Sequence, residues 1–245
     1  MRIVLTNDDG FGALGIETAK KILQQYGDVY VFAPATPQSG MSSGFTTYRK
    51  PTTVHKVDDH NFIVEGTPVD CVLFANSYFQ GDYDMIVSGC NHGYNLSNDI
   101  MYSGTCGAAK QGLVFKKKCI ALSAEPFDDD KHITEYVTQT LKFVTDNDLF
   151  GEDYYLNVNL TPTNVPHKGI RITKLYLRYL SKYTLTELGD EQYVVKHIHD
   201  DDIFDNDDYD VSAVHNGYTS ITPISLTNYK EEFYNKVKKK IKNKK

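Results

Sequence analysis

The sequence predicts an α/β protein with a Rossmann-like parallel-sheet core in three layers, a C-terminal β-hairpin excursion and a terminal helix. Two observations support this fold class. Through residues 1–125, short β-like runs alternate with helical stretches, which is typical of a parallel sheet covered by helices. After Glu125 the alternation gives way to β-like runs separated by turn signals. We therefore expect residues 1–125 to form the core that carries the functional site, and residues 126–245 to complete it.

Four strands and three helices are expected in the first part. Ile16, Ala19, Ile22 and Leu23 recur at helical spacing, while Thr67-Pro68 places a cap and a first-turn proline before an apolar run. The strands are short apolar runs. The expected strands are Arg2–Thr6, Val29–Ala33, Met85–Ser88 and Cys119–Ser123, and the expected helices are Ile16–Tyr26, the run that begins at Thr67, and Gly104–Phe115.

The second part is less regular. One β-like run alternates strictly, with Tyr155, Asn157 and Asn159 on one face and apolar residues on the other. Two further runs with turn signals predict the hairpin excursion. The expected elements are the helix His132–Asp146, the strand Tyr154–Leu160, the hairpin runs Ile170–Leu177 and Tyr193–Ile198, the strand Tyr218–Pro223 and the helix Tyr229–Ile241.

Charge and composition limit the classes of function. The formal net charge of −6 argues against a nucleic-acid polymer as partner, because phosphate contacts need a basic field. No apolar run approaches the roughly 18 residues that cross a bilayer, and Met1 begins no secretory signal. Four single cysteines suit a reducing compartment. We expect a cytoplasmic protein with no membrane contact, in which the Asp-rich segment 200–210 and the Lys-rich tail are solvated.

Adjacent carboxylates follow the first predicted strand. In open α/β sheets the ligand lies at the carboxyl ends of the strands, and Asp8 and Asp9 stand there, just before Gly10. Their oxygens suit a hard cation such as Mg²⁺, Mn²⁺ or Ca²⁺, which also relieves the repulsion between them. Both can reach one ion only if the chain turns, and Gly10 permits that turn. Capping of the following helix is the alternative that these residues leave open.

A glycine pattern in the same loop imitates a dinucleotide-binding fingerprint. Gly10, Gly12 and Gly15 spell G-x-G-x-x-G directly after a strand. However, the second strand ends in Ala33 and Pro34, so it offers no acidic residue for a ribose hydroxyl. The acidic pair would also repel a pyrophosphate. We therefore expect a metal site rather than a dinucleotide site.

The loop after the third predicted strand adds donors of two kinds. Ser88–Asn95 is dense in glycine and side-chain amides, and Ser103-Gly104-Thr105 opens the following helix. Backbone N–H groups at a helix N-terminus, with two hydroxyls beside them, favour an anion. An ordinary helix cap is the alternative for this segment taken alone. Together with the acidic pair, the segment predicts a metal-dependent hydrolase of phosphate esters.

These segments, with others, resemble the SurE survival-protein family. The motifs occur in the family's order and with compatible spacing, and they are dense over residues 1–125. Pro37 and Ser42-Ser43 depart from the usual pattern, which leaves the preferred base open. The motifs are Asn7-Asp8-Asp9-Gly10, Gln38-Ser39-Gly40, Gly66-Thr67-Pro68-x-Asp70-Cys71, Ser88-Gly89-x-Asn91-x-Gly93-x-Asn95, Tyr102-Ser103-Gly104-Thr105 and Gly217-Tyr218-x-Ser220-Ile221-Thr222-Pro223.

The resemblance implies a nucleoside monophosphate phosphohydrolase (5′/3′-nucleotidase) that depends on one divalent cation, Mg²⁺ or Mn²⁺, per subunit. A broader phosphomonoesterase or exopolyphosphatase activity stays open. It also implies a homodimer or homotetramer in which the C-terminal hairpin and helix are exchanged between subunits. By position, the metal ligands are Asp8, Asp9, Ser39 and Asn91, the catalytic residues are Asp8, Asp9 and Asn91, and the residues around the substrate phosphate are Ser39, Gly40, Asn95, Ser103, Gly104 and Thr105.

The residues are compatible with two mechanisms of phosphate-ester hydrolysis, and one other class of protein is the alternative to a hydrolase. A water on the cation attacks the phosphorus while Asp8 takes its proton, or Asp8 attacks and forms an aspartyl phosphate. Haloacid-dehalogenase-type phosphatases use the second route, but they carry another Asp where this chain has Gly10. A receiver-like switch module needs an Asp at the end of the third strand, where Ser88 stands. The hydrolase is therefore the favoured class, and the role of Asp8 stays open.

Overall fold

A computed structural model describes the chain, with residues 126–129, 178–181, 190, 199–207, 227–230 and 243–245 outside the described part. The helices are α1 (Leu14–Leu23), α2 (Pro68–Tyr78), the 3-10 helix η1 (Ser97–Met101), α3 (Gly104–Val114), α4 (Asp130–Asp146), α5 (Asp210–His215) and α6 (Glu231–Lys242). The strands are β1 (Arg2–Thr6), β2 (Asp28–Pro34), β3 (Val54–Lys56), β4 (Asn61–Val64), β5 (Met85–His92), β6 (Lys118–Ala124), β7 (Tyr154–Asn159), β8 (Ile170–Ile172), β9 (Lys182–Gly189), β10 (Gln192–Ile198) and β11 (Thr219–Ser225).

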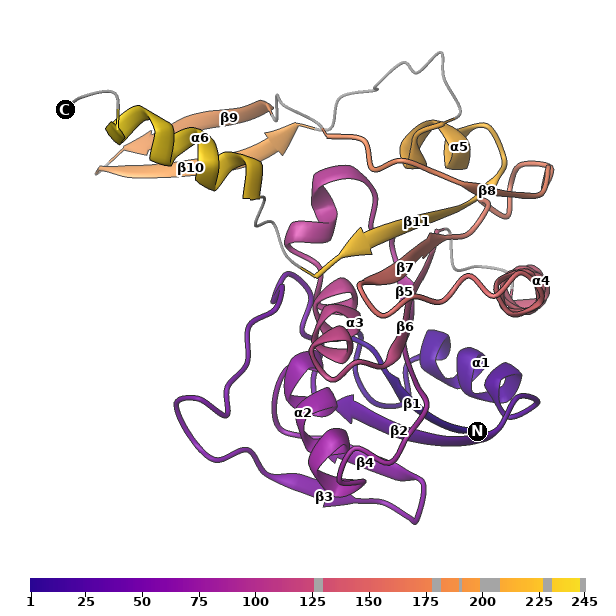
Figure 1. The fold of residues 1–245 in the computed structure, drawn as a ribbon. Coiled ribbons are helices and arrows are strands. Elements are labelled where there is room, and N and C mark those ends of the chain that lie inside the picture. The colour runs from indigo at the N-terminus through magenta and orange to yellow at the C-terminus, as the bar shows by residue number, and fades with distance from the viewer. Residues whose placement is uncertain (126–129, 178–181, 190, 199–207, 227–230, 243–245) are drawn as a thin grey trace.

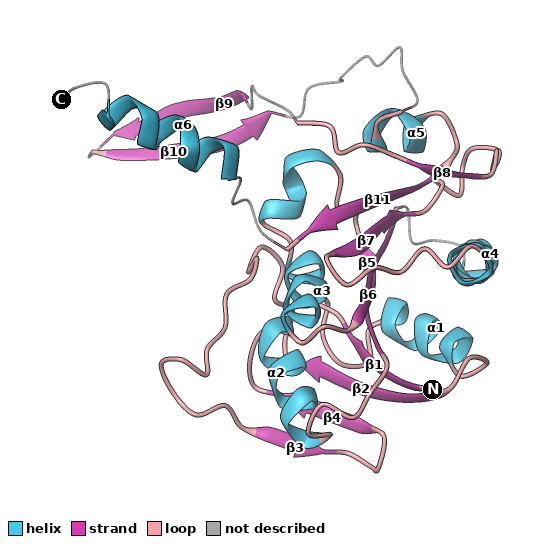
Figure 2. Ribbon diagram, in the orientation of Figure 1, coloured by secondary structure: helices cyan, strands magenta, loops and turns pink. Residues whose placement is uncertain are grey.

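The described residues form three layers around one large sheet. Helices α1 and α4 cover one face of the sheet, and α2 and α3 cover the other (Figure 1). The strand order is β3-β4-β2-β1-β5-β6-β7-β11-β8, while β9 and β10 form a separate two-stranded sheet. Figure 2 shows this hairpin next to α6, to one side of the large sheet. The predicted α/β class with a hairpin excursion and a terminal helix is confirmed.

Alternating side chains of the central strand explain why both faces are covered. Ile3 and Leu5 of β1 pack with Ile16 of α1 and Val137 of α4. Val4, between them in sequence, points to the opposite face and belongs to the cluster that includes residues of α2 and α3. Successive strand residues alternate between the two faces. An apolar run such as Arg2–Thr6 therefore requires helices on both sides of the sheet, as its sequence predicts.

The strand order reverses beside β1, and this reversal defines where a ligand can bind. β1 pairs in parallel with β2 on one side and with β5 on the other. The chain proceeds outwards through β2 and then returns past β1 to continue at β5. At such a switch point the loops leave in opposite directions and open a crevice at the carboxyl ends of the strands. Asp8 and Asp9 follow β1 into this crevice, and β5 ends at its other side.

Most expected elements lie where the sequence puts them. β1 has the predicted bounds, and α2 begins at Pro68 with Thr67 as its cap.

Among the helices of the described residues, none combines the length and the apolar character needed to span a membrane. Two short strands, β3 and β4, were not predicted, and they extend the sheet beyond β2. Their few residues pair through backbone hydrogen bonds, which leave little trace in a side-chain pattern.

The predicted hairpin is only half correct. The run at Ile170–Leu177 does not form one of its arms, because β8 pairs in parallel with β11 in the large sheet. The hairpin is instead made by β9 and β10, which pair in antiparallel register from Gln192 opposite Gly189 to Ile198 opposite Lys182. Tyr193–Ile198 was therefore assigned correctly, and its partner strand lies between the two runs that the sequence suggested.

The expectation of a solvated Asp-rich segment is wrong for Asp210. Of the seven aspartates in this segment, only Asp208 and Asp210 lie among the described residues. Asp210 is fully buried, and its carboxylate accepts hydrogen bonds from the Ser97 N–H (2.8 Å) and the Tyr176 N–H (2.9 Å). Burial raises its pKa, although these backbone donors act in the opposite direction. This aspartate therefore fixes the backbone around η1. The high density of aspartates in the segment predicted only that they would be exposed to water.

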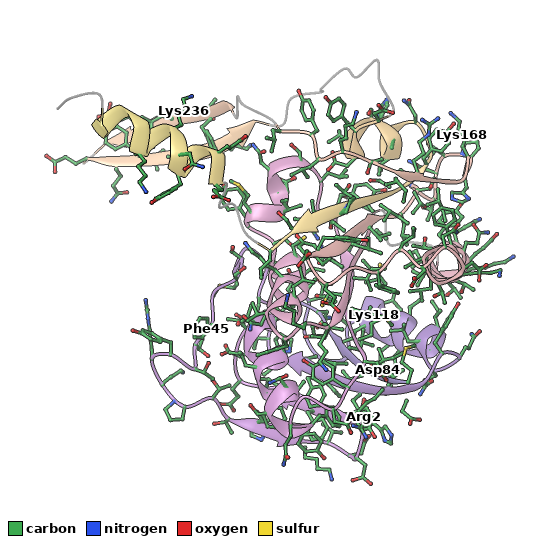
Figure 3. The ribbon with its side chains drawn as sticks, in the orientation of Figure 1. Arg2, Phe45, Asp84, Lys118, Lys168 and Lys236 are labelled. Atoms are coloured by element: carbon green, nitrogen blue, oxygen red, sulfur yellow. The ribbon has the colours of Figure 1, made fainter. Side chains whose placement is uncertain are left out.

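A second buried carboxylate holds the loop that connects β2 to β3. Asp70, on the first turn of α2, accepts hydrogen bonds from the N–H and hydroxyl groups of Thr46 and Thr47, at 2.8–3.1 Å. Its Oδ2 also accepts from the Thr67 N–H (2.9 Å), which completes the capping box of the helix. Phe45, exposed on this loop, precedes these threonines (Figure 3). The Gly-Thr-Pro-x-Asp motif thus anchors the loop on which Ser39 lies.

Replacing Asp70 by Asn tests this anchor. The amide NH₂ group would face backbone N–H donors, so we expect a loss of about 1–3 kcal/mol of unfolding free energy at pH 7. Burial acts to raise the pKa of Asp70, but the hydrogen bonds from Thr67, Thr46 and Thr47 outweigh it and lower the pKa. The contribution of the charged form is therefore complete above about pH 4, the unfolded-state value, and is lost as the pH falls through the lower folded-state pKa.

Urea unfolding of both proteins at pH 7 and in acid measures this contribution. The difference in stability between wild type and Asp70→Asn should shrink as the pH drops below about 4. Asp28→Asn, at an exposed position, is the control and should change stability little. Equal stability of the Asp70 variant and wild type at pH 7 would contradict the anchor.

Candidate active site

The loop after β1 turns sharply and brings the acidic pair to the edge of the sheet. Asn7 Nδ2 donates to the Gly10 carbonyl (2.9 Å), and the Gly10 N–H donates back to Asn7 Oδ1 (3.3 Å). Gly10 has a φ of +103°, where a Cβ would be strained. The N-cap of α1 is Ala13, and no side chain caps this helix. The turn at Gly10 is therefore confirmed, and capping of α1 by Asp8 or Asp9 is wrong.

Asp8 lies against the first turn of α3. Its side chain is almost completely buried, and Thr105 Oγ1 donates to Asp8 Oδ1 at 2.6 Å. A Cβ on Gly104 would lie 2.9 Å from Asp8 Cβ and 3.1 Å from its Oδ2. Glycine is therefore required at this position for the carboxylate to approach the helix. The contact joins the end of β1 to the N-terminus of α3 across 97 residues of sequence.

Both carboxylates of the pair have a raised pKa. For Asp8 the main cause is burial, the Thr105 hydroxyl acts to lower the pKa, and the negative charge of Asp9 raises it. Burial also raises the pKa of Asp9, against the lowering effect of the His92 N–H. Removal from water disfavours the charged form of each group. A cation next to two such carboxylates would favour the charged form of both.

The end of β5 contacts the second carboxylate. The His92 N–H donates to Asp9 Oδ2 at 3.2 Å. Asn91, immediately before it, donates from Nδ2 to the Gly93 carbonyl at 2.8 Å. Because this bond uses the nitrogen of the amide, Asn91 Oδ1 is the atom that can serve as an oxygen ligand. No role was predicted for His92, because its contact is made through the backbone N–H and carries no side-chain signal.

The loop after β2 reaches the same edge. The Gln38 N–H donates to the Asp8 carbonyl at 2.7 Å, so the residue before Ser39 lies against the acidic pair. Ser39 and Gly40 themselves are exposed. Further along, the Ser42 hydroxyl donates to the Met101 carbonyl at 2.7 Å. This loop is thus attached both to the Asp8 loop and to the segment that precedes α3.

The expected phosphate-binding residues lie at the N-terminus of α3 and beside it. Ser103 Oγ accepts from the Cys106 N–H (3.1 Å), so Ser103 is the N-cap of α3. The backbone N–H groups of the first turn have no partner within the helix. The Thr105 hydroxyl is directed to Asp8 instead. Asn95 is buried, and its Nδ2 donates to Ser123 Oγ at the end of β6 (2.7 Å).

These features define an α/β protein in which two adjacent carboxylates, Asp8 and Asp9, lie at the switch point of the sheet, next to the N-terminus of α3. The family model described as "Survival protein SurE" matches residues 3–182. The chain is 36% identical over 241 residues to a protein of Wigglesworthia glossinidia brevipalpis named 5′/3′-nucleotidase SurE, with 94% of each chain covered. It is 35% identical over 251 residues to the 5′-nucleotidase SurE of Petrotoga mobilis, covering 97% of this chain and 98% of the relative.

A solved structure agrees with the sequence comparisons. The crystal structure of the SurE protein from Aquifex aeolicus is similar with a TM-score of 0.83 and 31% sequence identity, over 97% of this chain and 98% of that one. The chain therefore belongs to the SurE family. The resemblance expected from the six motifs is confirmed.

Substituting Thr105 by Val tests the bond that joins Asp8 to α3. Val keeps the shape of the side chain but cannot donate, and the lost hydrogen bond removes stabilisation of the charged carboxylate. We expect the pKa of Asp8 in metal-free protein to rise further, as followed by carboxyl ¹³C shifts in an NMR titration. Thr140→Val is the matched control, because the buried Thr140 hydroxyl has no hydrogen-bond partner among the residues that the structure describes. An Asp8 pKa that stays the same or falls in Thr105→Val would refute the contact.

Proposed function

We propose that the chain is a divalent-metal-dependent nucleotidase that hydrolyses nucleoside monophosphates to nucleoside and inorganic phosphate. The names of the Wigglesworthia and Petrotoga relatives, nucleotidases aligned over nearly the whole chain, support this activity. The observation that carries the proposal is the contact between Asp8 and Thr105. It sets a buried carboxylate, suited to a cation, beside a helix N-terminus, suited to a phosphate.

In this proposal Asp8, Asp9, Ser39 and Asn91 hold one Mg²⁺ or Mn²⁺ ion. The donor set fits such an ion, because carboxylate, amide and hydroxyl oxygens are the ligands that hard cations prefer. The raised pKa of Asp8 and Asp9 adds support, since the pair is costly to keep charged without a positive partner. When bound, the cation would lower the pKa of a water and neutralise charge on the phosphoryl oxygens.

The protein's own groups would then fix the phosphate. The first-turn N–H groups of α3 point towards the helix N-terminus, where the helix dipole also favours an anion. Ser39 and Gly40, exposed at the edge of the site, would close it from the loop after β2. Asn95 would donate from its side-chain amide. Ser103, Gly104 and Thr105 complete the phosphate-binding set.

Hydrolysis replaces the bond between phosphorus and the nucleoside oxygen by a bond to a water oxygen. Asp8 would accept a proton of that water as the general base. The leaving oxygen takes a proton from solvent. Attack by Asp8 itself, through an aspartyl phosphate, is distinguished by a first turnover in ¹⁸O-water and a second in ordinary water. Label in the second phosphate would mean that oxygen passed through the carboxylate.

Substituting Asp9 by Asn tests the metal-dependent activity. Loss of outer-shell partners of a metal costs about 10–100-fold, so loss of a direct carboxylate ligand should cost about 100-fold or more in kcat/KM. Phosphate release from nucleoside monophosphates with Mg²⁺ or Mn²⁺ measures this, and EDTA should abolish it in wild type. Asp153→Asn, at an exposed position, should keep wild-type activity.

A near-normal rate in Asp9→Asn would remove this residue from the metal site. A wild-type protein that releases no phosphate from any nucleoside monophosphate would contradict the nucleotidase itself. Including 5′- and 3′-nucleotides, other phosphomonoesters and short polyphosphate in the same assay defines how broad the activity is.

We also propose a homodimer or homotetramer that exchanges the hairpin β9–β10 and helix α6 between subunits. Several apolar side chains of these elements are exposed within one chain, such as Leu185 (66%), Val195 (64%) and Val237 (59%). Lys236 of α6 lies beside the hairpin, well away from the large sheet (Figure 3). Burial of such residues against a second copy would remove apolar surface from water. Sedimentation equilibrium should give two or four chains, and a monomer at micromolar concentration would contradict exchange.

A reducing compartment such as the cytoplasm suits the cysteines. All four are free thiols and buried. Cys106, near the start of α3, has its pKa raised to about 11, mainly by burial. It is therefore a packing residue and not a reactive thiolate. Disulfides are rare in reducing compartments. Because the four cysteines are free thiols, we propose that the protein acts in the cytoplasm.

A further inference from the structure

Two buried asparagines of β7 contact the segment that carries Asn95. Asn157 and Asn159 are both 0% exposed, on the strand face that the alternating sequence groups with Tyr155. Burial removes water from a side-chain amide, so an amide without partners would be strongly destabilising there. The hydrogen-bond partners of Asn157 and Asn159 therefore indicate what these two side chains do in the structure.

The side chain of Asn159 pairs with both backbone groups of Asn95. The Asn95 N–H donates to Asn159 Oδ1 (2.8 Å), and Asn159 Nδ2 donates to the Asn95 carbonyl (3.1 Å). Asn157 Nδ2 donates to the same carbonyl at 2.8 Å. The N–H and both lone pairs of the carbonyl are thus used. The side-chain amides of β7 therefore bind the backbone N–H and carbonyl of Asn95. In a β-sheet, backbone groups of a neighbouring strand would make these two kinds of hydrogen bond.

The side chain of Asn95 is fixed in turn. Its Nδ2 donates to Ser123 Oγ, on a residue that is also fully buried. A primary amide has a second Nδ2 hydrogen, and in the proposed site this hydrogen would donate to phosphate. Two residues further on, Asp210 accepts from the Ser97 N–H (2.8 Å). The segment is therefore held by buried polar groups that lie far away in sequence.

We propose that Asn159 is a positioning residue for the phosphate site: it fixes the backbone of Asn95, so that the Asn95 amide meets phosphate in one orientation. This inference rests on the proposed function, in which Asn95 binds the substrate phosphate. A donor that is already ordered loses little freedom when its ligand binds, and the affinity is higher for that reason. Of the two asparagines, Asn159 contacts both backbone groups.

Binding of inorganic phosphate to the Mn²⁺-loaded protein, measured by calorimetry, tests this role in two variants. Asn159→Leu removes both hydrogen bonds without adding charge. Asn159→Asp keeps the acceptor for the Asn95 N–H, loses the donor to the Asn95 carbonyl and adds a buried charge, so circular dichroism first confirms that each variant is folded. Each should bind phosphate about tenfold more weakly than wild type, the effect expected for loss of one or two buried hydrogen bonds. KM for the nucleotide should rise in parallel.

Thr161→Val is the matched control for general loss of stability. Thr161 is buried two residues along the chain, and its hydroxyl is 3.2 Å from Thr219 Oγ1. This variant should lower the melting temperature about as much as the Asn159 variants but leave phosphate affinity unchanged. Equal weakening of phosphate binding in Thr161→Val would overturn the positioning role, because the effect would then be that of any destabilised strand.

Other outcomes also overturn the proposal. Wild-type affinity in Asn159→Leu does so directly, and weakening in Asn159→Asp alone would mean that only the added charge matters. A wild-type protein that binds no phosphate also overturns it. Nucleotide hydrolysis by the same wild-type samples tests the proposed function separately. A wild type that binds phosphate but releases none from a nucleotide contradicts the nucleotidase and not the positioning by Asn159.

Discussion

The buried carboxylate of Asp8, in contact with the first turn of α3, is the interaction on which the rest of the site depends. Removing a carboxylate from water costs several kcal/mol in proteins unless other groups offset that cost. Here the Thr105 hydroxyl donates to it at 2.6 Å, and the N-terminal end of the α3 dipole lies next to it. Gly104 is dictated by the same contact, because a Cβ would meet the carboxylate. The Ser-Gly-Thr motif therefore holds the Asp8 carboxylate, in addition to its proposed role in binding phosphate.

A common principle holds the loops around that contact. Two of the loops at the carboxyl edge are attached by buried polar side chains that come from outside them: Asp70 for the β2–β3 loop, Asp210 and Asn159 for the segment after β5. Buried hydrogen bonds to charged groups are strong, and an unmade one is costly. These bonds hold both loops in place without a ligand. Preorganised donors of this kind stabilise charge with little further rearrangement.

Some of this could be predicted from sequence. The helical spacing of Ile16 to Leu23 and the Thr67-Pro68 cap each correspond to a local rule, and so the elements were found. Asp8, Asp9 and the Ser-Gly-Thr motif were found because consecutive polar residues at strand ends converge at one edge of a parallel sheet. The alternation of Asn157 and Asn159 placed them on one face but gave no indication of what that face contacts.

What could not be predicted depends on distant contacts. The direction of the Thr105 hydroxyl is set by a residue 97 positions away, and the burial of Asp210 by a segment 113 positions away. No local pattern encodes either. The short strands β3 and β4 and the pairing of β8 with β11 likewise follow from available sheet edges, which only the tertiary structure defines.

In the proposed site, one cation and one phosphate bind side by side at Asp8 and the N-terminus of α3. A crystal grown with Mn²⁺ and inorganic phosphate locates both ions, the metal through its anomalous scattering. We expect one anomalous peak per chain within coordination distance of carboxylate oxygens of both Asp8 and Asp9, with phosphate density at the first-turn N–H groups of α3. A peak elsewhere, with the acidic pair free of metal, would contradict it.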